Sequence, residues 1–200
     1  MLRAFLHKEL TEAGCDEAGR GCLAGPVFAA AVILPNSYYH PLLNDSKVLS
    51  EAARYALRTE IEATAVAYSV AYATVAEIDA INILQATYLA MHRAIAGLSV
   101  LPQMLLIDGN RFKPYADIQH TCIIKGDAQF YAIAAASILA KTYRDDYMKT
   151  LAAQHPTYQW EKNKGYPTVA HRRGILQHGT TVHHRKSFTL LPENVQGILF

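Results

Sequence analysis

The sequence has few cysteines and no arrangement that would pair all of them. Cys15, Cys22 and Cys122 are odd in number, and none belongs to a Cys-x-x-Cys motif. This argues against a disulfide framework and against a thiol-rich zinc site, and it fits a reducing compartment. We therefore expect three small packed side chains in a cytoplasmic protein, because free cysteine is among the most often buried residues.

A long hydrophobic run is also missing. The longest apolar stretch, Tyr131 to Ala140, is well short of the ~20 residues that a membrane-spanning helix needs, and we expect it to be the buried face of a helix. The first 14 residues interrupt their few apolar positions with charged side chains, which is not typical of a secretory signal. We expect neither export nor membrane association, and a monomer by default.

The net charge of +2 is small, but the charges are unevenly distributed. Residues 161–186 hold one acidic residue, Glu161, against six basic ones and four histidines: Lys162, Lys164, Arg172, Arg173, Arg185, Lys186, His171, His178, His183 and His184. A basic segment suits contact with a polyanion such as nucleic acid. A solvated surface explains the same pattern equally well.

The order of hydrophobic patterns predicts an α/β fold. Runs rich in Val, Ile, Tyr and Ala predict strands at 26–35, 65–74, 103–109 and 121–127, with a fifth short strand before Asp16. Helices are expected at 51–62 behind Ser50 as N-cap, at 76–96 and at about 128–153. This order predicts a mixed sheet flanked by helices, with a catalytic domain over 1–154 and a C-terminal extension, 155–200, packed on it.

Asp16 and Glu17 stand side by side before a glycine-containing turn. Neighbouring carboxylates repel each other unless a cation binds between them. Adjacent strand residues point to opposite faces, so a shared site would require the strand to end or bulge here. The alternative is an ordinary solvated pair.

Two further carboxylates follow predicted strands. Asp108 ends an apolar strand, with Gly109 permitting a sharp exit, and either faces a cleft or serves as an Asx-type turn residue. Asp127 precedes the long helix, and taken alone this position favours an N-cap role over a site role. If all four carboxylates converge, they form an oxygen-rich site suited to Mg²⁺ or Mn²⁺.

The string CDEAGRGCLAGPV, from Cys15 to Val27, resembles the signature of the ribonuclease HII family. The resemblance continues in order through NDSKVLS (44–50), LLIDGN (105–110), KGD (125–127), AAASILAKTYRD (134–145), GYPT (165–168) and HRKSF (184–188). Nearly the whole chain is covered, and so many motifs in order argue against coincidence. At Lys186 the chain departs from the commoner HRRSF, which weakens only an assignment of bidentate phosphate contact there.

This resemblance implies a ribonuclease H-like fold, a five-stranded mixed sheet flanked by helices with a C-terminal helical extension. It implies hydrolysis of the RNA strand of RNA–DNA hybrids and incision 5′ of ribonucleotides embedded in duplex DNA, leaving 3′-hydroxyl and 5′-phosphate ends. Such activity serves ribonucleotide excision and hybrid removal. The implied cofactor is Mn²⁺ or Mg²⁺, with two ions in the substrate complex.

The family's site residues carry over by motif. The metal-binding carboxylates correspond to Asp16, Glu17, Asp108 and Asp127. A turn whose backbone contacts the ribose 2′-hydroxyl corresponds to Gly19, Arg20 and Gly21, and a tyrosine that packs on the next deoxyribose corresponds to Tyr166.

Several residues keep competing explanations. Tyr166 also fits a core tyrosine, and Lys47, which resembles a phosphate-side contact, also fits a solvated loop. Pairing within a helix explains Lys141 and Asp145, so the Lys141–Asp145 segment is left outside the site. We interpret the His183-His184 pair as exposed or phosphate-side histidines, because no third metal ligand accompanies them.

Three other functions are weighed against this one. Ribonuclease HIII shares the fold but usually carries an extra N-terminal domain and lacks this glycine turn. A non-catalytic hybrid-binding module would lack a carboxylate, and an enzyme for small phosphate esters would leave Tyr166 and the basic segment unexplained. Finally, the terminal residues 196–200, from Gln196 to Phe200, resemble peptides that dock on the bacterial sliding clamp, or form an apolar tail on the core.

Overall fold

Five strands form one mixed sheet in the order β3-β2-β1-β4-β5. The computed structural model describes residues 2–43 and 49–192. β1 pairs antiparallel with β2, which pairs antiparallel with β3, whereas β1, β4 and β5 run parallel. The elements are, in chain order, β1 (Glu12–Ala18), β2 (Val27–Ile33), α1 (Glu51–Thr64), β3 (Ala67–Ala73), α2 (Val75–Ala96), β4 (Met104–Asp108), β5 (Gln119–Ile123), η1 (Gly126–Ala128), α3 (Tyr131–Gln154), η2 (Pro156–Tyr158), α4 (Trp160–Asn163) and α5 (Val169–His178).

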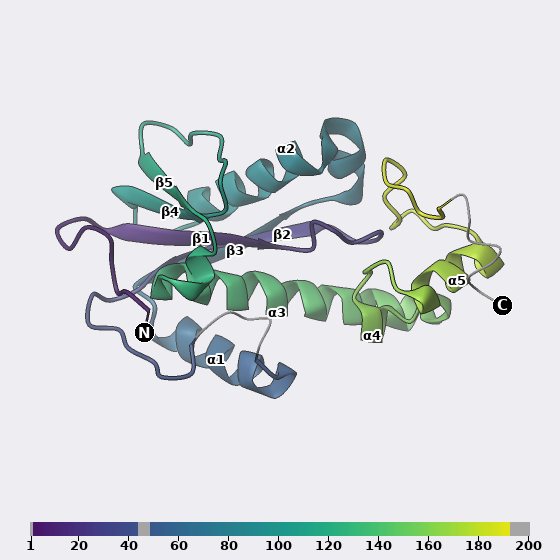
Figure 1. The fold of residues 1–200 in the computed structure, drawn as a ribbon, viewed down its shortest axis with the longest axis horizontal. Coiled ribbons are helices and arrows are strands. Elements are labelled where there is room, and N and C mark those ends of the chain that lie inside the picture. The colour runs from purple at the N-terminus through teal and green to yellow at the C-terminus, as the bar shows by residue number, and fades with distance from the viewer. Residues whose placement is uncertain (1, 44–48, 193–200) are drawn as a thin grey trace.

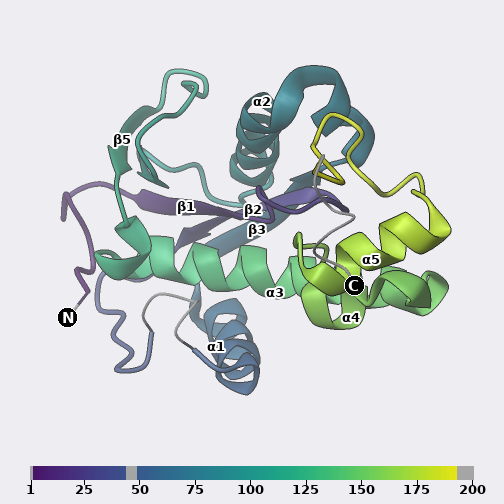
Figure 2. The same ribbon diagram turned by 45° about the vertical axis from the view of Figure 1, so that its right-hand side comes forward.

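Helices cover both faces of the sheet. α2 lies on one face, the long α3 lies on the other, and α1 packs against α3 on the side away from the sheet (Figures 1 and 2). The short helices α4 and α5 lie around the C-terminal end of α3 (Figure 1). This confirms the predicted α/β class and the mixed five-stranded sheet. Within the described residues, no helix is long and apolar enough to cross a membrane.

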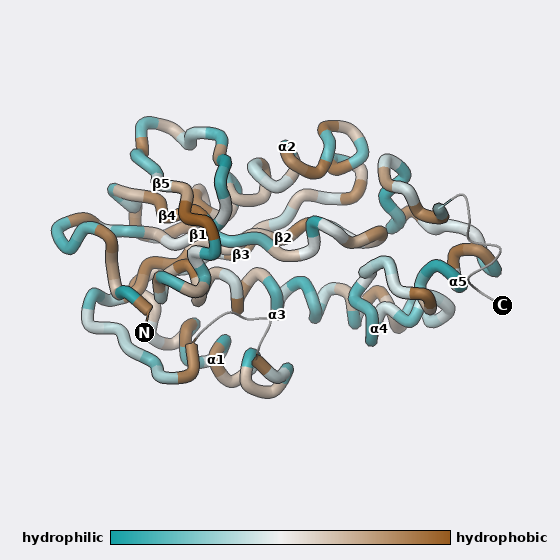
Figure 3. The backbone as a smooth tube through the Cα atoms, viewed as in Figure 1, coloured by the Kyte–Doolittle hydropathy of each residue, from teal (hydrophilic) through white to brown (hydrophobic). Residues whose placement is uncertain are grey.

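The inner strand β2, between β3 and β1, is buried on both faces, which explains its continuous run of apolar residues. Its odd-numbered residues pack in the core beneath α2, and its even-numbered residues pack in the core beneath α3. All ten residues from Tyr131 to Ala140 are buried in α3, as the apolar run predicted. Brown, hydrophobic stretches occur both in the strands and on the helices, whereas the loop between β4 and β5 is largely hydrophilic (Figure 3).

Local details differ from the sequence predictions where a turn interrupts a regular element. β5 ends at Ile123, so the predicted strand over 121–127 is wrong beyond that residue, and the chain forms the 3-10 turn η1 instead. α2 contains a break at Asn82, whose φ of 65° is left-handed and whose side chain accepts hydrogen bonds from Leu84 and Gln85. The prediction of Ser50 as the N-cap of α1 is confirmed, because its hydroxyl accepts a hydrogen bond from Ala53 N.

Beyond α3, a separate apolar cluster joins the C-terminal segment to the rest of the molecule. Its centre is Trp160, which is fully buried together with residues of α3 and the segment 23–24. The segment that follows β1 and the segment that follows α3 are therefore packed against each other. This packing places the C-terminal segment next to the end of β1.

Candidate active site and nucleic-acid interface

A cavity of about 360 Å³ lies where β1 and β4 end. Three of the four predicted carboxylates, the whole predicted glycine turn and the predicted tyrosine line it: Asp16, Glu17, Asp108, Gly19, Arg20, Gly21 and Tyr166. These residues come from three separated parts of the sequence and meet at one opening. The three carboxylates form an acidic end of the cavity, and the glycine turn forms a wall in which backbone groups are exposed.

Asp16 and Glu17 reach this cavity from the last residues of β1. No bulge interrupts the strand, which pairs Asp16 with Ala30 and Glu17 with Ala29 in regular register, but β1 ends at Ala18, so of the two expected alternatives the structure shows the strand end. The two side chains leave opposite faces of the strand, with Asp16 next to Ser137 of α3 and Glu17 also bordering α2. Both carboxylates line the cavity because β4 ends at this level, which uncovers that edge of β1.

Asp108 lies at the end of β4, next in register to Asp16. The last residue pair of the β1–β4 ladder is Cys15 with Ile107, so Asp16 and Asp108 are the next neighbours along the two strands. The Asp108 Oδ1 atom accepts a hydrogen bond of 2.7 Å from Gly126 N, which lies 18 residues away. This long-range contact fixes the carboxylate from outside its own turn, while Gly109, with φ of 107°, makes the sharp exit.

Asp127 is buried within η1, directly after the residue that bonds to Asp108. The N-cap interpretation is wrong, because α3 begins only at Tyr131 and its N-cap is Phe130. Asp127 is not among the residues that line the cavity. Its predicted metal role rests on the link through Gly126 and stays a prediction.

The carboxylates at the acidic end of the cavity repel one another. Burial of Asp16, together with repulsion from Glu17 and Asp108, raises the pKa of its carboxyl well above the usual value. Arg20 partly offsets this charge through an ion pair of 3.0 Å with Glu17. Among the described residues no three His, Cys, Asp or Glu side chains form a group ready to hold a metal ion. A cation bound here would relieve the repulsion, and carboxylate oxygens are the donors that Mg²⁺ and Mn²⁺ prefer.

The two glycines of the turn have different surroundings. Gly19 has a φ of 93°, and a Cβ atom there would lie 1.9 Å from Nε of Arg144. Gly21 has open space where its side chain would be. The first glycine therefore permits close packing below the turn, whereas the second leaves the cavity side open.

Tyr166 faces this turn across the cavity. Its side chain is 39% exposed, so the alternative of a core tyrosine is wrong. The backbone carbonyl of Tyr166 is held at 2.9 Å by Nδ1 of the buried His171. The ring is therefore presented to solvent on a fixed backbone.

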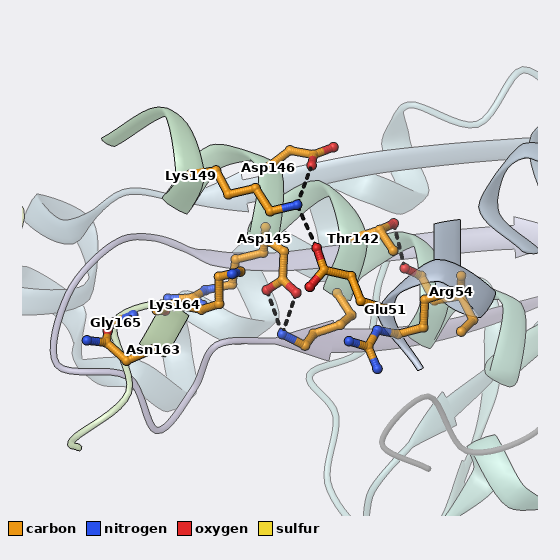
Figure 4. Close-up of polar contacts among 12 residues, drawn as sticks. Glu51, Arg54, Thr142, Asp145, Asp146, Lys149, Asn163, Lys164 and Gly165 are labelled. Atoms are coloured by element: carbon orange, nitrogen blue, oxygen red, sulfur yellow. Dashed lines mark hydrogen bonds and ion pairs between the residues drawn. The ribbon is translucent and has the colours of Figure 1, made fainter. Parts of the chain in front are cut away.

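Other residues of the cavity wall were missed from the sequence. Arg54, Ser137 and Lys141 also line it. Lys141 does make the expected ion pair within α3, at 2.5 Å from Asp145, but this pair does not remove it from the site. Figure 4 shows Arg54 on α1 facing the stretch of α3 that carries Asp145. Lys141 belongs to one of the motifs that resemble the family, and that resemblance was the signal that could have included it in the predicted site.

A second ion pair fixes α1 against α3 beside this wall. Nζ of Lys149 lies 2.8 Å from Oε1 of Glu51 and also contacts Asp146 (Figure 4). These residues are exposed, so the pair contributes little to stability.

The C-terminal basic segment is less exposed than its sequence suggested. Lys164 and Arg185 are buried, whereas Lys162, Arg173 and Lys186 are exposed. The interpretation of the histidine pair is wrong for His184, which is 1% exposed and lies against His171 and Trp160. No histidine pattern predicted this burial, because the aromatic partners come from distant positions.

Two predicted contacts lie outside the described residues. Lys47, the predicted phosphate-side residue, falls within 44–48. The predicted clamp peptide from Gln196 to Phe200 falls within 193–200. Both stay predictions. All three cysteines are free, with Cys15 and Cys22 buried and Cys122 partly buried.

Comparison with known proteins places this architecture among ribonucleases. The model of the ribonuclease HII family matches residues 13–191. Ribonuclease HII of Bacteroides thetaiotaomicron is 60% identical over 200 residues, covering 100% of both chains. Ribonuclease HII of Bacteroides fragilis is 63% identical over 191 residues, covering 96% of this chain and 95% of the relative.

Among solved structures the fold is shared at much lower identity. The ribonuclease HII in a PCNA complex from Archaeoglobus fulgidus is 24% identical, with a TM-score of 0.75, covering 94% of this chain and 100% of that one. A Bst ribonuclease HIII in complex with Mn²⁺ is 17% identical, with a TM-score of 0.72, covering 95% of this chain and 70% of that one.

Proposed function

This chain belongs to the ribonuclease HII family, whose activity is endonucleolytic cleavage of RNA–DNA hybrids, and from that premise we propose that it also incises duplex DNA 5′ of single embedded ribonucleotides. The products would carry 3′-hydroxyl and 5′-phosphate ends. One observation carries the proposal: three carboxylates, the glycine turn and Tyr166 line a single cavity. Chemistry and recognition of the sugar can then occur at the same phosphodiester.

The carboxylates are proposed to hold divalent Mn²⁺ or Mg²⁺. Asp16, Glu17 and Asp108 supply oxygen donors at the cavity, and Asp127 would complete the set from η1. The raised pKa of buried Asp16 supports this assignment, because a neighbouring cation would favour its charged form. Two such ions supply an activated water and stabilisation of the leaving oxygen in phosphodiester hydrolysis.

The opposite wall is proposed to read the sugars. Backbone groups of Gly19, Arg20 and Gly21 can approach a ribose closely and bond to its 2′-hydroxyl, which distinguishes RNA from DNA. The exposed ring of Tyr166 offers a flat apolar surface on which the following deoxyribose packs. Lys141 and Arg54 add positive charge beside the carboxylates, which suits the phosphates of the cleaved strand.

Two cellular features extend this proposal. The three free cysteines fit a reducing cytoplasm. The peptide from Gln196 to Phe200 is proposed to dock on the sliding clamp, in keeping with the PCNA complex of the Archaeoglobus fulgidus enzyme. The clamp contact would deliver the enzyme to newly replicated DNA.

The test uses three end-labelled duplexes of one sequence: DNA with one ribonucleotide, an all-RNA strand on DNA, and DNA alone. With Mn²⁺ or Mg²⁺ we expect a single cut 5′ of the ribonucleotide, and mapping of the ends should give a 3′-hydroxyl and a 5′-phosphate. DNA alone should stay intact. Cleavage of the all-RNA strand without any cut at the single ribonucleotide would overturn the sugar-reading assignment.

A further inference from the structure

Arg185 is a fully buried arginine whose side chain bonds only to backbone carbonyls beneath the glycine turn. Its Nη2 donates to Gly19 O at 2.8 Å, its Nη1 to Arg20 O at 2.8 Å, and its Nε to Gly25 O at 2.9 Å. It makes no ion pair with any described carboxylate. Burial lowers the pKa of Arg185 to about 10, which still leaves it charged at neutral pH. The buried guanidinium of Arg185 therefore donates its hydrogen bonds to carbonyls in and just after this turn.

The two carbonyls held by the Nη atoms define the direction of two N–H groups. In a trans peptide the C=O and the following N–H point in opposite directions within the peptide plane, and the described chain has no cis peptide. Because Gly19 O and Arg20 O point at Arg185, the N–H groups of Arg20 and Gly21 point away from it. Arg20 and Gly21 are both among the residues that line the cavity.

We propose that Arg185 is a positioning residue that aims the Arg20 and Gly21 N–H groups at the ribose 2′-hydroxyl and strengthens them as donors. This rests on the proposed sugar-reading role of the turn. A charged donor on each carbonyl polarises the peptide, and hydrogen bonds in such a chain reinforce one another. The planar guanidinium can hold two neighbouring carbonyls at once, which a lysine ammonium does far less well.

A second buried arginine shows that this contact is specific to one residue. Arg144 also donates three hydrogen bonds to backbone carbonyls, but these belong to Pro26, Lys164 and Ala24. None of its hydrogen bonds reaches the turn at Gly19. Arg185 alone, among the described arginines, links the C-terminal motif to the carbonyls of the glycine turn.

The test compares wild type with Arg185→Lys on two duplexes that differ only in the 2′ substituent of one nucleotide. One contains a single ribonucleotide, and the other a 2′-fluoro nucleotide, whose fluorine is a weak hydrogen-bond acceptor. We expect Arg185→Lys to lower kcat/KM on the ribonucleotide about 10-fold or more, equivalent to the loss of one to two hydrogen bonds, and to lower it much less on the fluoro substrate. The ratio of the two values is the readout.

Controls separate positioning from general destabilisation. Ile95→Ala creates a cavity in the buried core beneath α2 and leaves the lining of the active-site cavity unchanged, so it should lower stability without changing the substrate ratio. Should Arg185→Lys fail to fold, Arg185→Gln at about 15 °C serves as the second variant, since Gln spans only one of the two carbonyls. Folding is checked by the fluorescence of Trp160.

An unchanged ratio in a folded Arg185 variant would overturn the inference while leaving the proposed function intact. The proposed function itself would be overturned by either of two results with the wild-type enzyme: no cut at the ribonucleotide, or equal cutting of the ribonucleotide and fluoro substrates. A ratio that fell equally in Ile95→Ala would assign the effect to stability and also overturn the positioning role.

Discussion

Lowering the pH from 7 to 5 should destabilise this protein through the buried imidazole of His184. Its Nδ1 accepts a hydrogen bond of 3.0 Å from Thr181 N, and its other nitrogen faces Nε2 of His171 at 3.2 Å. Nε2 of His171 in turn accepts a hydrogen bond from Trp160. These contacts favour neutral rings, because a second proton on either histidine would meet a buried donor or another ring.

The magnitude follows from the pKa. Burial, with repulsion from His171 as a lesser cause, lowers the pKa of His184 to about 4, whereas an unfolded histidine has a pKa of about 6.5. Below about 6.5 the unfolded chain binds a proton that the folded chain does not, so stability falls as the pH falls. At 1.36 kcal/mol per unit, the roughly 1.5 units between pH 6.5 and 5 correspond to about 2 kcal/mol.

The assay is urea unfolding at pH 7, 6 and 5, followed by the fluorescence of Trp160, the only tryptophan of the chain. The matched variant is His184→Gln, which keeps an acceptor near Thr181 but does not titrate. Its loss of unfolding free energy between pH 7 and 5 should be smaller than that of wild type by about 2 kcal/mol, since titrations that do not depend on His184 cancel in the difference. Parallel losses in the two proteins would refute the assignment.

Three further predictions concern the turn, the carboxylates and the C-terminus. Gly19→Ala should lower the free energy of unfolding by at least about 1–2 kcal/mol because of the positive φ at this position, besides the clash with Arg144. It should also lower ribonucleotide cleavage more than hybrid binding, and normal activity would contradict the tight turn. Metal-free Asp16→Asn should melt above wild type at pH 8 but not at pH 4, where the carboxyl with its raised pKa is already neutral; equal melting at both pH values would contradict the repulsion. Deleting residues 196–200 should abolish pull-down by purified sliding clamp while hybrid cleavage is retained, and undiminished pull-down would exclude that peptide.

Much of the fold follows from local pattern. Continuous apolar runs predicted β2 and the buried half of α3, because a strand or helix covered on several sides has no exposed face to alternate. Element ends were harder to predict, since η1 depends on the long-range contact between Gly126 and Asp108. No local signal in KGD reveals a partner 18 residues away.

The site shows the same division between local and distant causes. Motifs predicted Asp16, Glu17 and Asp108, and all three line one cavity. The assumed bulge was wrong because the opening is made by the end of β4, which the sequence of β1 does not contain. Burial of His184 and Arg185 likewise arises from contacts with residues 13 to 166 positions away along the chain.

The most direct test of the central claim is cleavage of duplex DNA containing one ribonucleotide by wild type, Asp108→Asn and Asp117→Asn. Asp117 is an exposed carboxylate of the loop between β4 and β5 that does not line the cavity, so it serves as the matched control. We expect Mn²⁺- or Mg²⁺-dependent incision by wild type and Asp117→Asn, none by Asp108→Asn, and none in EDTA. Undiminished incision by folded Asp108→Asn, or incision in EDTA, would contradict the carboxylate metal site.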